Sequence, residues 1–125
     1  MKPGAERIVK TQIKKACALV GCHMWSNSSG AALNPAGRLI RFGLANDSGE
    51  QNAWIKSSDL IGISKGGKFV AIEVKKEKWK FTGTPREVAQ QNFLDLVNSR
   101  GGIAFFCNSV EDFLNKYREL ERLKS

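Results

Sequence analysis

Two short apolar runs, Leu60–Ile63 and Phe69–Ile72, are separated by the polar sequence KGGK at residues 65–68. Paired glycines between β-rich runs are typical of a hairpin, because tight hairpin turns need positive φ angles. The pattern therefore predicts a β-hairpin. Asp59 lies where its first strand begins, and Glu73 lies where its second strand ends.

The length of the hairpin loop decides which side chains share a face of the sheet. A strict two-residue turn would place Asp59 on the face away from Glu73, since strand side chains alternate between faces. An odd loop or a bulge within residues 65–68 would instead pair Asp59 near Glu73 or Lys75. A third arrangement leaves Asp59 just beyond the paired region.

Apolar residues recur at helical spacing in three other segments. They predict a helix over Ala5–Val20 and a second helix that opens at Thr84 and ends before Gly101. The second has a strong start signal, because Glu87 follows Thr84 at the spacing of a capping box. A third helix is predicted after Ser109, which would cap it.

The remaining segments complete an α/β pattern. Gly21–Gly37 is rich in Ser, Asn and Gly and is predicted to be a loop. Strands are expected at Arg38–Leu44 and Ile103–Cys107. The second of these suits a sheet interior and should lie parallel to the strand that ends at Glu73. We expect one α/β domain over residues 1–125, a small mixed sheet flanked by helices.

Charge and cysteine count narrow the class of protein. The 125 residues carry a formal net charge of +8, which favours a polyanionic partner, nucleic acid before membrane. No apolar run reaches the roughly 18 residues of a membrane span, and the N-terminus lacks a signal-peptide core. Three cysteines, an odd number, favour a reduced intracellular chain with buried thiols.

Acidic and basic residues at the open end of the hairpin suit phosphodiester hydrolysis. Asp59 and Glu73 would bind Mg²⁺ or Mn²⁺, hard cations that prefer oxygen ligands, and the backbone carbonyl of Val74 is a further candidate ligand. Lys75 would position the attacking water or stabilise the transition state.

Two further polar residues are predicted on inward helix faces. Glu6 would bind the metal directly or through water, or it would simply complement the helix dipole in the first turn. Gln90 would orient a water or reach the scissile phosphate, or it would only hydrogen-bond the sheet. The sequence leaves open whether Gln90 or the adjacent Gln91 has this role.

After the hairpin, lysines alternate with acidic and aromatic residues. Lysines neutralise phosphates, and exposed aromatic rings stack on bases. The alternative is a solvated basic loop whose aromatic rings pack inward. The candidate DNA-binding residues are Lys76, Lys78, Trp79, Lys80, Arg86, Arg38 and Arg41.

A zinc site is the competing metal chemistry. Cys17, Cys22 and His23 lie close in sequence, with Cys107 distant. The C-x4-C-H spacing is poor for a structural zinc site, and buried thiols are favoured instead.

Taken together, the matching pieces resemble the PD-(D/E)xK nuclease superfamily, and within it the virus-type replication-repair nuclease (VRR-NUC) domain. The resemblance spans Glu6 to about Phe113. It departs from the family at Ser58, where the family has proline, and in the longer segment between Lys75 and Gln90. The pieces that carry it are Glu6, SDLI at residues 58–61, AIEVK at 71–75, Gln90 with Phe93-Leu94, and GGIA at 101–104.

The resemblance implies a restriction-endonuclease-like αβββαβ core. It also implies a Mg²⁺- or Mn²⁺-dependent endonuclease for branched DNA such as Holliday junctions or flaps. Its active site would comprise Glu6, Asp59, Glu73, Lys75 and Gln90. A homodimer from a phage or bacterium is expected, possible partners being other replication or repair proteins. The alternatives are a non-catalytic nucleic-acid-binding module of this fold and a sequence-specific restriction-like enzyme.

Overall fold

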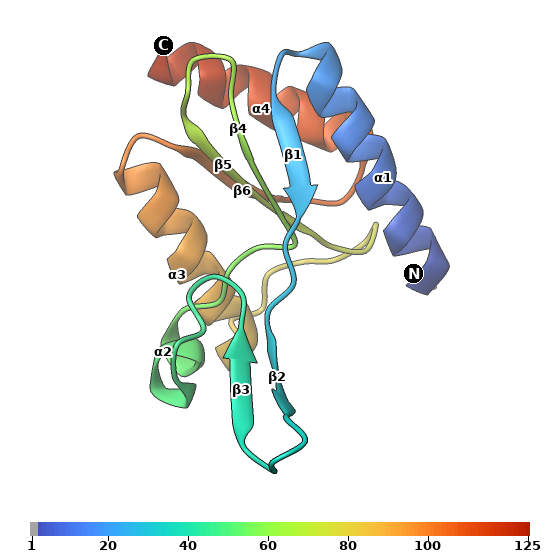
Figure 1. The fold of residues 1–125 in the computed structure, drawn as a ribbon. Helices are drawn as coiled ribbons and strands as arrows, with labels where there is room; N and C mark the ends of the chain where they lie inside the picture. The colour runs from blue at the N-terminus through green and yellow to red at the C-terminus, as the bar shows by residue number, and fades with distance from the viewer. Residues whose placement is uncertain (1–2) are drawn as a thin grey trace.

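The computed structural model describes residues 3–125 and contains two sheets, one of four strands and one of two. Figure 1 shows the helices packed around the main sheet and the two-stranded hairpin that extends from one end of the domain. In chain order the elements are α1 (Pro3–Leu19), β1 (His23–Ser26), β2 (Gly30–Leu33), β3 (Leu39–Phe42), α2 (Gly49–Trp54), β4 (Leu60–Ile63), β5 (Phe69–Val74), α3 (Pro85–Ser99), β6 (Ile103–Cys107) and α4 (Val110–Lys124).

The main sheet is mixed and has the strand order β1-β4-β5-β6. β1 and β4 are antiparallel, as are β4 and β5, whereas β6 runs parallel to β5, as predicted. α1 and α4 pack on one face around Ile13, Phe113 and Tyr117, which are fully buried. α3 packs on the other face, where Phe93 and Leu94 meet Ala71 and Ala104. The predicted α/β class and small mixed sheet are confirmed.

The predicted helices and their caps are also confirmed. The Thr84 hydroxyl accepts a hydrogen bond from the Glu87 backbone, and the Glu87 carboxylate accepts one from the Thr84 backbone. Ser109 caps α4 by accepting from the backbone N–H of Asp112. Gly21 ends α1 with a φ of +84°, the conformation that made glycine the expected stop residue.

The prediction that residues 21–37 form a loop is wrong. This segment contains β1, the edge strand that pairs with β4, and β2. The strand predicted at Arg38–Leu44 exists as β3, but it pairs only with β2, outside the main sheet. The Ser and Asn residues that suggested a loop lie at 26–29, at the end of β1 and between the two strands, and pairing with β4 and β3 overrides the local composition.

The prediction that Ile103–Cys107 lies in the interior of the sheet is also wrong, because β6 is an edge strand. Its apolar composition has another cause. α3 covers one face of β6 and α4 covers the other, so both sets of alternating side chains are mostly buried.

Two of the three cysteines are not free thiols. The structure joins Cys17 and Cys22 in a disulfide, with their Cα atoms 5.1 Å apart, because the turn at Gly21 folds the chain back on the end of α1. Cys107 is free and buried, and burial raises the pKa of its thiol to about 12. Within residues 3–125, none of the helices combines the length and hydropathy needed to cross a membrane.

A three-residue loop sets the register of the β4–β5 hairpin. The Ser64 N–H donates to the Lys68 carbonyl (2.9 Å), so residues 65–67 form an odd loop, and Gly67 has a φ of +86°. Ile63 consequently pairs with Phe69 and Leu60 with Ile72. The next positions along these strands are Asp59 and Glu73, the pairing that an odd loop predicts.

Substitution of the two loop glycines should separate backbone conformation from packing. We expect Gly67→Ala to lower the free energy of unfolding by roughly 1–2 kcal/mol, because a Cβ disfavours positive φ. Nothing lies within 4 Å of that Cβ, so no clash contributes. Gly66→Ala is the matched control, since its φ is not positive and its Cβ would meet only the Ser64 hydroxyl at 4.0 Å. Equal losses in urea unfolding would contradict this reading.

Candidate active site at the open end of the β4–β5 hairpin

Asp59 and Glu73 face each other across the end of the hairpin. The Asp59 N–H donates to Glu73 Oε2 (3.1 Å), and the Val74 N–H donates to Asp59 Oδ2 (3.0 Å). Asn27, which follows β1, fixes the backbone by donating its N–H to the Asp59 carbonyl (2.7 Å). These bonds hold the two carboxyl groups together at the open end of the β4–β5 hairpin, the arrangement that an odd loop predicts.

Glu73 is a buried acid beside another acid. Its side chain lies on the face of the sheet that α3 covers, and the residue is only 5% exposed. Burial, followed by the charge of Asp59, raises the pKa of the Glu73 carboxyl to about 8. Without a cation, the pair therefore favours one shared proton at neutral pH over two negative charges.

Gln90 links Glu73 to Lys75. Its amide nitrogen donates to Glu73 Oε1 (3.2 Å), and its amide oxygen accepts from Lys75 Nζ (2.7 Å). Gln91 points elsewhere and donates to Asp95 (2.8 Å). Gln90 is thus the glutamine that belongs to this cluster, in a continuous polar chain from Asp59 through Glu73 to Lys75.

Aromatic rings surround the Lys75 ammonium. Lys75 Nζ lies 5.3 Å from the Trp79 ring centroid and 5.6 Å from that of Phe106. The centroids of the two rings lie 4.8 Å apart, and the Trp79 indole N–H donates to Glu87 Oε2 (2.8 Å). Trp79 therefore packs inward, as in the alternative considered from the sequence, and it orients Lys75. Lys75 itself does not line the cleft in front of the carboxylates.

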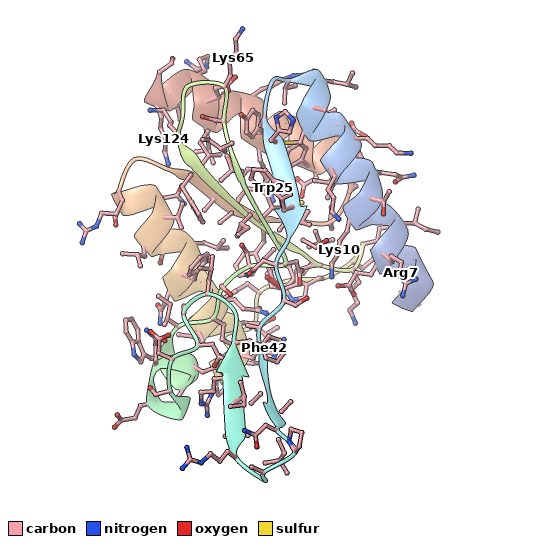
Figure 2. The ribbon with its side chains drawn as sticks, viewed as in Figure 1. Arg7, Lys10, Trp25, Phe42, Lys65 and Lys124 are labelled. Atoms are coloured by element: carbon pink, nitrogen blue, oxygen red, sulfur yellow. A yellow bond between two sulfur atoms is a disulfide. The ribbon has the colours of Figure 1, made fainter. Side chains whose placement is uncertain are left out.

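Glu6 reaches the cluster only through Lys10. The Lys10 ammonium lies 3.3 Å from Glu6 Oε1 and 3.4 Å from Asp59 Oδ1. Burial of Lys10 opposes its charge, but the charges of Asp59 and Glu6 outweigh burial and raise its pKa. Figure 2 shows Lys10 on the side of α1 that faces the sheet. Glu6 thus lies at the rim of the site.

A polar cleft of about 470 Å³ opens in front of Asp59 and Glu73. One wall is formed by the β2–β3 hairpin, where buried Asn46 donates to the Gly30 and Phe42 carbonyls and accepts from Arg41. The cationic side chains that line the cleft are Lys10, Arg41, Lys56 and Arg86.

Two of the predicted DNA-binding residues, Arg41 and Arg86, therefore belong to this cleft. The others, Arg38, Lys76, Lys78, Trp79 and Lys80, lie outside its lining. Sequence reasoning missed Lys10 and Lys56. Lys10 could have been found from the sequence, because it follows Glu6 by four residues, the spacing of an ion pair on a helix. No local pattern identifies Lys56, because the contact between α2 and α3 is what brings it to the cleft.

Two side chains at this site could be ligands of one divalent cation. Asp59 and Glu73 offer hard oxygen ligands that repel each other, and a cation would take the place of the shared proton. Within residues 3–125, no three His, Cys, Asp or Glu side chains gather closely enough to hold a metal ion. The Val74 carbonyl remains a predicted ligand, while the Val74 N–H already holds Asp59.

Comparisons of this chain with protein-family models, with curated proteins and with solved structures found no match.

Proposed function

We propose that the chain is a metal-dependent deoxyribonuclease of the PD-(D/E)xK type, as the resemblance to VRR-NUC domains implies. One observation carries the proposal. Asp59 and Glu73 face each other from neighbouring strands, and Lys75, two residues beyond Glu73, joins them through Gln90. The chain order of the main sheet with α1 and α3 is helix, three strands, helix, strand, which is the αβββαβ order that the family implies.

Mg²⁺ or Mn²⁺ is the proposed cofactor, with Asp59 and Glu73 as its protein ligands. When bound there, the ion would lower the pKa of a water and neutralise charge on a phosphate. Glu6 lies near enough to Lys10 to tune the charge around Asp59, which supports an indirect role for it.

The chain's own residues supply positioning and charge. The two hydrogen bonds of Gln90 hold the Glu73 carboxyl and the Lys75 ammonium in fixed relation. Lys75 lies outside the lining of the cleft, so its ammonium would act on the negative charge of the transition state from behind Glu73, at the position that Gln90 fixes. The four cations of the cleft would bind the DNA backbone and bring a phosphodiester to the carboxylates.

Branched DNA as the substrate is proposed on the resemblance alone, and so is a homodimer. A surface available for a second copy is the β2–β3 hairpin, which exposes apolar side chains on both of its faces. These are Leu33, Leu39, Ile40 and Phe42. Patches of this kind usually mark contact sites, and light scattering that finds only an active monomer would overturn the dimer.

A non-catalytic DNA-binding module is the second candidate. The observation that favours it is Lys10, whose ammonium already neutralises part of the charge on Asp59. In that case the carboxylates would have a structural role, and the cationic cleft would bind DNA without cutting it.

Cleavage of labelled four-way junction, flap, single-stranded and duplex DNA separates the two candidates. We expect Mg²⁺- or Mn²⁺-dependent cutting that EDTA abolishes, and a loss of at least about 100-fold in Lys75→Ala, the scale of removing one preorganised transition-state contact. Lys15→Ala is the control, because Lys15 is an exposed lysine of α1 outside the cleft lining, and it should stay within a few-fold of wild type.

Gln90→Ala and Gln91→Ala form a second matched pair, because only Gln90 contacts Glu73 and Lys75. Tight DNA binding with no cutting under any of these conditions would favour the binding module. Equal losses in both members of a pair would indicate damage to the fold rather than to the site.

The metal-free protein should be most stable at acidic pH because of Glu73. Its folded-state pKa of about 8 exceeds the ordinary value of 4.5, so the folded chain holds a proton that the unfolded chain releases. The free energy of unfolding therefore falls as pH rises from 4.5 to 8.

Glu73→Gln removes this titration while keeping the shape of the side chain. We expect it to stabilise the metal-free protein at pH 8.5 by more than about 1.4 kcal/mol, the value of one pKa unit, relative to its effect at pH 5. Mn²⁺ should raise the unfolding temperature of wild type at pH 8.5 and not that of the variant. A pH-independent effect of the substitution would contradict the raised pKa.

A further inference from the structure

The face of the main sheet that carries Glu73 is only half covered. α3 packs on β5 and β6, and residues on the same face of β1 and β4 extend beyond it. The pairing register places Trp25 opposite Ile61, which is opposite Ala71, and places His23 opposite Ile63, which is opposite Phe69. These two rows alternate regularly with the row formed by Asp59 and Glu73, so the side chains of all three rows project from one face.

Large apolar side chains are exposed on this open half. Trp25 is 55% exposed, Ile63 46% and Phe69 43%. The His23 and Trp25 rings stack with their centroids 6.4 Å apart and their planes 28° apart. Figure 2 shows Trp25 on β1, the edge strand, with α1 on one side of it. The open half therefore exposes aromatic and aliphatic side chains side by side.

Cations lie at both ends of this surface. Lys56, Arg41 and Arg86 line the cleft at the carboxylate end. At the other end, Lys68 and Arg100 line a groove of about 430 Å³ beside Phe69. Between the ends, β1, β4 and β5 carry no acidic side chain on this face apart from Asp59, where β4 begins, and Glu73. Proteins bind single-stranded nucleic acids on surfaces of this kind, where aromatic rings stack on the bases and nearby cations contact the phosphates.

We propose that the open half-face, comprising His23, Trp25, Ile63 and Phe69, is a stacking platform for unpaired nucleotides next to the bond that is cut. This inference rests on the proposed nuclease function and specifies its substrate as DNA with a single-stranded segment. The spacing suits it, because Ile61, the pairing partner of Trp25, is two residues and therefore about 7 Å along β4 from Asp59. A base stacked on Trp25 belongs to a nucleotide one or two positions from a phosphate held at Asp59 and Glu73.

The test is binding of fluorescein-labelled oligo(dT) to the full chain in EDTA, where cutting cannot interfere. Base–aromatic stacking contributes about 1–3 kcal/mol, so Trp25→Ala should weaken binding by about 5- to 150-fold. Trp25→Phe should recover most of the affinity, since it keeps an aromatic ring. Trp54→Ala is the matched control, because Trp54 is also exposed (60%) but lies on α2, off the sheet, and it should bind as wild type does.

Two outcomes would overturn the platform. The first is equal oligo(dT) affinity in Trp25→Ala and wild type. The second is conversion of a dimer to a monomer by Trp25→Ala at unchanged affinity, which would make this face an interface between copies of the chain. Failure of the nuclease proposal is distinguishable, because it would appear as Trp25-dependent oligo(dT) binding together with no metal-dependent cutting by wild type.

Discussion

The register of the β4–β5 hairpin is the constraint on which the candidate site depends. Because strand side chains alternate, one residue more or less in the loop would turn Asp59 away from Glu73. The three-residue loop, with Gly67 at positive φ, fixes the pairing of Leu60 with Ile72. The two hydrogen bonds between the Asp59 and Glu73–Val74 segments extend that pairing beyond the last strand residue. A loop at one end of the hairpin thus determines which side chains meet at the other end.

This arrangement concentrates charge at a cost to stability. Glu73 is buried, faces Asp59, and has a pKa near 8, so its ionised form is disfavoured in the folded chain. Stability alone would favour an apolar residue at that position. A strained acid pair beside a cationic cleft is the kind of feature found at functional sites, where charge is arranged for a ligand. The neighbouring Gln90 and Lys75 are satisfied, which limits the strain to the carboxyl pair itself.

The sequence was sufficient for the features that follow from local rules. The capping box at Thr84 and Glu87 located α3, and helical spacing identified the inward position of Gln90. For the hairpin loop the sequence left several arrangements open, and the structure contains the odd loop at residues 65–67 that the nuclease interpretation required. Each of these predictions rests on residues close in the chain or on one pairing of adjacent strands.

The parts that sequence reasoning missed depend on tertiary contacts. β1 reads as loop, and its partner is β4, some 35 residues further on in the chain, so no local pattern reveals the pairing. The cleft forms because α2 and the β2–β3 hairpin, inserted between β1 and β4, lie against the carboxylates and bring Lys56 and Arg41 there. The misassignment of β1 also hid the open half-face, since His23 and Trp25 were assigned to a loop rather than to the face that carries Glu73.

The open half-face and the carboxylates are linked by geometry as well as by proximity. α3 contributes Gln90 to the site and also ends where Arg100 lines the far groove, so a single helix borders the whole surface. A second helix packed on β4 and β1 would have buried Trp25 and stabilised the domain. The chain instead leaves that apolar area exposed beside its most destabilised acid. Because both departures from maximal stability lie on one face, we propose that they belong to one binding surface.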